Sequence, residues 1–169
     1  YNSSSTLYGA FISKQVDVLL SNSIEDTLRY GLNLLNQKKD IKEGQSEPIE
    51  ISFISLRTNK IPLNNIDIRL AIAKSLNREL IRNKVSFNLR SSASSLIPLI
   101  LKKDNSVSWP DFDPKESKRI FRDQGYCDGN IFNLPLTYRS NVPTDKLIAF
   151  YWQQSLKAEM KDCFSISIN

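Results

Sequence analysis

The chain has 169 residues, of which 40% are hydrophobic and 24% charged, and its net charge at pH 7 is +5. This composition is that of a globular domain with a sizeable core, and no run of about 18 apolar residues is present that would cross a membrane. The chain begins at Tyr1 and not at Met, without the basic and apolar regions of a signal peptide, so we expect an excised piece or a processed protein.

The residue types that are missing exclude several classes of chemistry. Histidine is absent, and Cys127 and Cys163 are the only cysteines. Ser-His and Cys-His nucleophile systems therefore cannot form, and two cysteines leave no typical zinc site. The two cysteines could be reduced or bridged, because bridging depends on a Cα separation that the spacing does not reveal. The basic residues are dispersed along the chain, which favours a solvated basic surface over a nucleic-acid footprint.

The first 48 residues predict a strand, a helix and a loop. The β-branched run 16–20 (VDVLL) suits a strand. A helix follows, with Ser23 as its N-cap, Asp26 as the capping-box partner and leucines recurring at helical spacing. Residues 36–48 are polar and include Gly44, which predicts a loop and a domain boundary.

Residues 49–101 predict a strand, a long helix and a packed loop. In 49–53, apolar and polar residues alternate as in a half-buried strand. Asn65 is placed to cap the next helix, and Asp67 lies in its first turn, where a negative charge is favourable. A single apolar stripe continues along this helix, made of Ile68, Ile72, Leu76 and Leu80. The apolar run 96–101 within a Ser-rich stretch indicates a packed loop.

The segment 113–125 carries the clearest local signal in the chain. Asp113 is expected to be the N-cap, Pro114 the first helical residue, Glu116 the capping-box partner and Gly125 the residue that ends the helix.

The last forty residues predict a β-α-β unit. Residues 131–138 alternate as a strand, in which Pro135 favours an edge position or a bulge. A helix is expected over 143–161 and a final strand over 164–168. The succession of elements predicts an α/β or α+β layered fold in which helices cover a sheet.

No constellation of catalytic residues is visible. The carboxylate pairs Glu25–Asp26 and Asp111–Asp113 are explained by helix starts and a turn, and no Gly-rich phosphate loop, nucleophile elbow or calcium-loop spacing occurs. We therefore expect neither enzymatic activity nor a metal or other cofactor.

The segment 62–81, PLNNIDIRLAIAKSLNRELI, resembles a signature of bacterial extracellular solute-binding proteins of family 5, the oligopeptide/dipeptide type, which reads P-F-x-D-x-R-V-R-x-A-I-x-x-A-I-D-R-x-x-I. Four more stretches resemble family segments in the same order: FISKQVDVLL, ISFISLRTNKIP, FDPKESKRIFRDQGY and the final NLPLTYRS…FSISI. The sequence departs from the family pattern at Lys14-Gln15, Arg57, Asn65, Asn77 and Cys163-Phe164.

The resemblance implies part of a two-lobed type II periplasmic-binding-protein fold. Residues 1–48 would belong to or border the first lobe, and 49–169 would form part of the second α/β lobe. The implied function is the substrate-binding component of an ABC importer, which captures peptides between the lobes and delivers them to permease subunits in the inner membrane. The implied location is the periplasm, or the outside of the cell in association with the membrane. Glu50 and Phe53 are the expected ligand contacts, whereas Arg69 and Arg78 are interpreted as structural.

Two alternatives stay open. The ligand could be nickel, a sugar or an opine-like solute, or the chain could be a basic nucleic-acid or partner-binding domain. Because the resemblance covers only part of such a receptor, we expect the 169-residue chain alone to bind ligand poorly or not at all.

Overall fold

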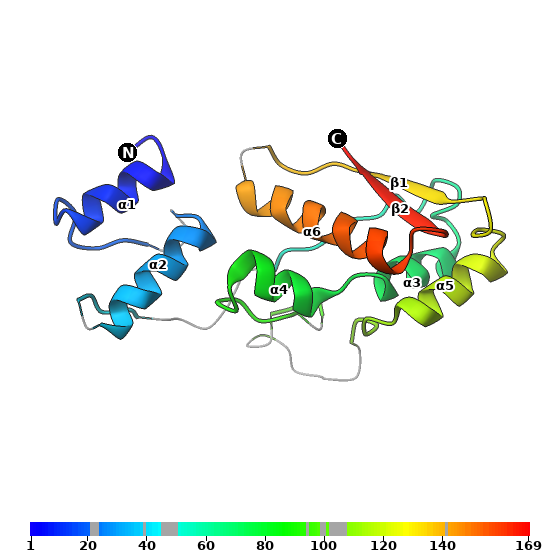
Figure 1. Ribbon diagram of the computed structural model, residues 1–169, viewed down its shortest axis with the longest axis horizontal. Coiled ribbons are helices and arrows are strands. Elements are labelled where there is room, and N and C mark those ends of the chain that lie inside the picture. Colours follow the sequence, from blue (N-terminus) through cyan, green and yellow to red (C-terminus); the bar gives the residue numbers. More distant parts are fainter. Residues whose placement is uncertain are drawn as a thin grey trace.

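The computed structural model describes residues 1–20, 24–38, 40–44, 51–93, 95–98, 101, 108–140 and 142–169. The elements in chain order are α1 (Ser4–Ile12), α2 (Asp26–Gln37), α3 (Ile66–Lys74), α4 (Arg78–Ser86), α5 (Pro114–Asp123), β1 (Phe132–Leu136), α6 (Pro143–Glu159) and β2 (Phe164–Ile168). Helices α1 and α2 lie at one end of the molecule, and α3, α5 and the sheet lie at the other, with α4 and α6 between them (Figure 1).

The N-terminal region differs from the prediction. The structure contains α1, which the sequence analysis did not predict, and its N-cap Ser3 forms a capping box with Thr6. The predicted strand at 16–20 is wrong: the segment forms no strand and bends at Asp17, and Val18 and Leu20 are largely exposed. A β-branched run forms a strand only where another strand supplies the hydrogen bonds.

The start of α2 also differs. The N-cap is Glu25, which makes no side-chain capping bond, and the predicted cap Ser23 lies outside the described residues. Asp26 is the first helical residue and not a capping-box partner, because its carboxylate is bound by Arg90. The predicted loop 36–48 begins too early, because Asn36 and Gln37 still belong to α2. Residues 40–44 are described and have neither helical nor strand structure.

The predicted strand at 49–53 is not found in its described part. Residues 51–57 are extended without ladder pairing, and Ile49 lies outside the described residues. Ile54 and Leu56 pack against the core, whereas Phe53 is exposed. The alternation of the side chains therefore occurs at 54 and 56, and Phe53 does not face the core.

The single helix predicted along 62–81 is two helices. Asn65 caps α3 as predicted, since its side chain accepts a hydrogen bond from the Asp67 N–H at 2.8 Å. The helix then breaks at Ser75, whose buried hydroxyl donates to the Ile72 carbonyl. Asn77 starts α4 by accepting the Leu80 N–H, so a favourable N-cap residue inside the apolar stripe divides it.

Helix α5 confirms the prediction at both ends. Asp113 accepts the Glu116 N–H, Pro114 is the first helical residue, and Gly125 follows the C-cap with φ +82°. The capping box is only half formed, because the Glu116 side chain is bound by Arg119 instead. Ser117, fully buried, donates to the Ala71 carbonyl at 2.7 Å and joins α5 to α3.

The C-terminal unit is a parallel β-α-β arrangement, as predicted. Strands β1 and β2 pair in parallel with Phe132 opposite Phe164, and α6 packs on β2. Pro135 lies within β1, which is an edge strand of the two-stranded sheet that the described residues form. A disulfide joins Cys127 to Cys163, which answers the question that the sequence left open.

The core lies among α3, α5, α6 and the sheet. Its largest fully buried side chains are Trp152, Phe121 and Phe164, and Phe121 stacks on Phe164 with ring centroids 5.0 Å apart. No residue of α1 or α2 belongs to the described core cluster. The packed loop predicted at 96–101 is wrong in its described part, since Leu96, Ile97 and Leu101 are more than half exposed and Leu99 and Ile100 lie outside the described residues.

Candidate functional site

The two arginines of the signature segment are structural, as predicted. Arg69 donates from Nη1 to the backbone carbonyls of Leu63 and Asn64 and so fixes the turn that enters α3. Arg78 donates to the Pro110 carbonyl at 3.1 Å and lies 3.6 Å from the Asp111 carboxylate, which ties α4 to the segment before α5. Both guanidinium groups thus bind the chain itself.

The two predicted ligand contacts differ in what the structure says of them. Phe53 is 68% exposed on the extended segment 51–57, while its neighbours Ile54 and Leu56 pack against the core. An exposed aromatic ring on a segment anchored by its neighbours is available for contact with a ligand or another part of the protein. Glu50 lies outside the described residues.

A second group of residues, which the sequence analysis did not identify, joins α2 to α4. Asp26, 4% exposed, receives two hydrogen bonds from Arg90, at 2.9 Å from Nε and 3.0 Å from Nη2. The ring of Tyr30 stacks on Phe87 with centroids 4.8 Å apart. Phe87 ends α4 in the left-handed region, with φ 51°. We call Asp26, Arg90, Tyr30 and Phe87 the α2–α4 clasp.

The local sequence carries no signal for the clasp. Asp26 and Arg90 are 64 residues apart, and each looks locally like an ordinary helix-start carboxylate or loop arginine. Only the fold brings the two groups together.

Two shallow hollows lie on the surface. One of about 110 Å³ lies between α6 and β2, lined by Gln153, Leu156, Lys157, Lys161, Phe164, Ser165 and Ile166. The other, about 10 Å³, lies where α2 meets α4 and α6, lined by Glu25, Asp26, Thr27, Val85, Pro143, Thr144 and Leu147. Small-molecule sites usually have about 300–1,000 Å³, so neither hollow could enclose a solute in this conformation.

Three exposed or half-buried carboxylates are held ionised by arginines. The Ser92 hydroxyl and then the Arg82 guanidinium lower the pKa of Glu79. Hydrogen bonds from Arg119 lower the pKa of Glu116, and those from Arg139 lower the pKa of Asp145. A general acid at neutral pH needs the opposite shift, so these carboxylates suit structural ion pairs.

The described residues hold no group of three or more His, Cys, Asp or Glu side chains that could bind a metal ion. None of the helices in the described part is both long and apolar enough to cross a membrane.

Solved structures share the fold over the whole chain. NikA from Brucella suis, in complex with Fe(III)-EDTA, matches 99% of this chain and 35% of its own with a TM-score of 0.83 at 20% identity. An oligopeptide-binding protein, OppAIV of Borrelia burgdorferi, matches 100% of this chain and 33% of its own with a TM-score of 0.67 at 19% identity. The predicted fold class, an α/β fragment of a type II periplasmic binding protein, is thereby confirmed.

Comparison of sequences also finds solute-binding proteins. The glutathione-binding protein GsiB of Salmonella choleraesuis (strain SC-B67) is 25% identical over 124 residues, which are 73% of this chain and 24% of the relative. The chain therefore spans about a quarter of the length of the curated relatives that it matches. The model of the family described as bacterial extracellular solute-binding proteins, family 5 Middle, matches residues 1–159, and the chain belongs to this family.

Proposed function

We propose that the chain is part of the substrate-binding component of an ABC-type oligopeptide importer, which captures peptides between two lobes and delivers them to a membrane permease. The observation that carries the proposal is the family match over residues 1–159, together with a fold shared with oligopeptide-binding proteins. A receptor of this kind performs no chemistry on its ligand.

The proposed lobe boundary lies between residues 48 and 49. The core cluster begins at Leu63, Ile54 and Leu56 pack against it, and α1 and α2 contribute no residue to it. Helix α1 packs on α2, and among the named elements α2 has its principal contact with the rest of the fold at α4 (Figure 1). Residues 1–48 then belong to or border the first lobe, and 49–169 form part of the second.

The ligand site lies in the cleft between the lobes in this proposal. Phe53, exposed near the proposed boundary, and Glu50, which precedes it by three residues, are the proposed contacts on this chain. Extended peptides are commonly held by main-chain pairing, with pockets for side chains. Closure of two lobes around a ligand is an established type of protein motion. The cleft would face the periplasm or the cell exterior, and the disulfide fits an oxidising compartment of that kind.

A second candidate ligand is a nickel complex. It is favoured by the similarity to NikA and to NikZ of Campylobacter jejuni, whose structure is described as a complex with Ni(L-His). Since this chain contains no histidine, such a complex would have to bring its own nitrogen ligands or find them elsewhere in the whole protein.

Native mass spectrometry of the whole protein, purified without denaturation, tests the proposal. The expected result is a set of co-purified peptide masses that disappears after denaturation and refolding and returns when a synthetic tripeptide-to-pentapeptide library is added. A single non-peptide mass, or a nickel complex, would replace peptide by that solute. A protein that emerges empty and does not bind the library would refute peptide capture.

A further inference from the structure

We propose that the α2–α4 clasp is an interlobe latch that stabilises the closed conformation of the receptor. The inference rests on the proposed function, since it takes residues 1–48 and 49–169 to belong to different lobes. Under that division Asp26 and Tyr30 lie on the first lobe, whereas Phe87 and Arg90 lie on the second. Each half of the clasp therefore crosses the boundary.

The charged half of the clasp is a bidentate ion pair between Asp26 and Arg90. Asp26 is buried and its two carboxylate oxygens each accept one hydrogen bond from the same guanidinium, at 2.9 and 3.0 Å. Bidentate arginine–carboxylate pairs combine strength with strict geometry. Opening the lobes would separate the pair and return both groups to water, which limits the net stabilisation of the closed form.

The aromatic half adds a stacking contact between partly exposed rings, since Tyr30 is 39% exposed. Tyr30 and Phe87 stack with an interplanar angle of 17°. Phe87 is the C-cap of α4 and lies three residues before Arg90. Tyr30 lies four residues after Asp26, so the two side chains share one face of α2. That face meets the end of α4, and a shallow hollow beside it includes residues at the start of α6.

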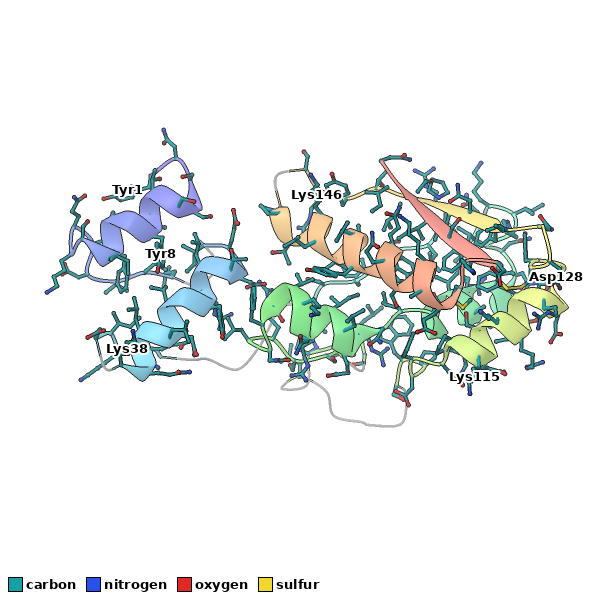
Figure 2. The ribbon with its side chains drawn as sticks, viewed as in Figure 1. Tyr1, Tyr8, Lys38, Lys115, Asp128 and Lys146 are labelled. Carbon is teal, nitrogen blue, oxygen red and sulfur yellow. A yellow bond between two sulfur atoms is a disulfide. The ribbon has the colours of Figure 1, made fainter. Side chains whose placement is uncertain are left out.

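Outside the clasp, α2 also packs on α1. Gly31 faces Tyr8 of α1, where an added Cβ would come within 3.2 Å of the tyrosine hydroxyl oxygen, so α1 and α2 approach closely. In Figure 2 Tyr8 lies beside the contact of the two helices. We therefore expect α2 to move with α1 as one body when the clasp opens.

The magnitude follows from the chemistry of the pair. Hydrogen bonds to charged groups are stronger than neutral ones, but Arg90 is half exposed and water screens it. We expect Asp26→Asn to lower the ratio of closed to open molecules about ten-fold. Tyr30→Leu, which keeps an apolar side chain but removes the stacked ring, should lower the ratio by a smaller factor, about three-fold.

The test measures the distance between the lobes in the whole protein. Spin labels are attached through Lys38→Cys and Lys115→Cys, because both lysines are exposed and lie near opposite ends of the fold (Figure 2). The native cysteines are buried in their disulfide and are not labelled. Distance distributions are recorded by pulsed electron resonance for the parent, Asp26→Asn and Tyr30→Leu, each with and without the synthetic peptide library. The control is Glu116→Gln, which removes an ion pair with Arg119 confined to α5.

The outcomes separate the latch from the peptide proposal. Both clasp variants should shift population toward the longer distance, while Glu116→Gln leaves the distribution unchanged. If the library closes the parent and the clasp variants to the same extent with identical distributions, the latch is wrong although peptide capture holds. If the clasp variants open but no library peptide binds, the latch holds and peptide capture is wrong. A single fixed distance in every variant shows that α2 and the second lobe are one rigid body, which also overturns the latch.

Discussion

Reduction of the Cys127–Cys163 disulfide should substantially destabilise the part of the fold that contains β1, α6 and β2. The two cysteines are 36 residues apart and enclose β1 and α6, the central part of the β-α-β unit. In the chain-entropy model, a cross-link over a loop of this length removes unfolded-state entropy worth about 3.8 kcal/mol at 25 °C. Cys127 and Cys163 are both nearly inaccessible, so reduction exposes little new surface to solvent while the protein stays folded.

The assay is equilibrium unfolding in urea with and without a reductant, followed by tryptophan fluorescence. Trp152 is 1% exposed and its ring contacts Phe164, the residue after Cys163, so its emission reports the region of the cross-link. With a urea dependence of about 2 kcal/mol per molar, the transition midpoint should fall by about 2 M on reduction. The double variant Cys127→Ala/Cys163→Ala should have a midpoint close to that of the reduced protein.

Two results would refute this reasoning. Thiol titration of the denatured, non-reduced protein that finds two free thiols would show that the disulfide does not form. A midpoint that shifts by less than about 0.3 M, with the disulfide intact beforehand, would show that the unfolded chain gains little freedom when the loop opens.

Three further predictions address other parts of the fold. Ser117→Ala should lower the free energy of unfolding by about 1 kcal/mol in urea titrations, because the Ala71 carbonyl loses the serine hydroxyl but keeps the Ser75 N–H; no change would mean that the α3–α5 contact does not depend on this bond. Because Arg139 lowers the pKa of Asp145, the pair stabilises the fold above the ordinary carboxyl pKa of about 3.9, and this stabilisation is lost as pH falls through the lowered value. Asp145→Asn should therefore lower the urea midpoint at pH 7 but not at pH 2, and an equal decrease at both would contradict the ion-pair account. The 169-residue chain alone should show no micromolar affinity for the peptide library by calorimetry, since the proposed cleft needs both lobes; such affinity would place a complete site within this chain.

The local signals of the sequence located the starts of α3, α5 and α6. Asn65 and Asp113 cap their helices as predicted, and Gly125 follows the end of α5 in the left-handed region. These signals succeed because a capping bond joins groups within three residues of each other, and so its geometry depends little on the rest of the fold. The division of the signature helix at Ser75 was missed, although Asn77 carried the same kind of signal inside an apolar stripe.

Strands were predictable only where their partners lie in the chain. The periodicity of 131–138 and 164–168 located β1 and β2, which pair with each other. The runs at 16–20 and 51–53 have similar patterns but no ladder in the structure. An alternating pattern states which residues suit a pleated surface, whereas a strand also needs a neighbour at hydrogen-bonding distance.

The sequence by itself determined the N-caps of α3 and α5, the β-α-β unit and, through its signature segments, the family. Tertiary structure alone decided which distant groups meet: Cys127 with Cys163, Ser117 with Ala71, and Asp26 with Arg90. The physical reason is range. Capping bonds and periodicity act within a few residues of the chain, whereas these three contacts form only when packing brings together segments that are 36, 46 and 64 residues apart.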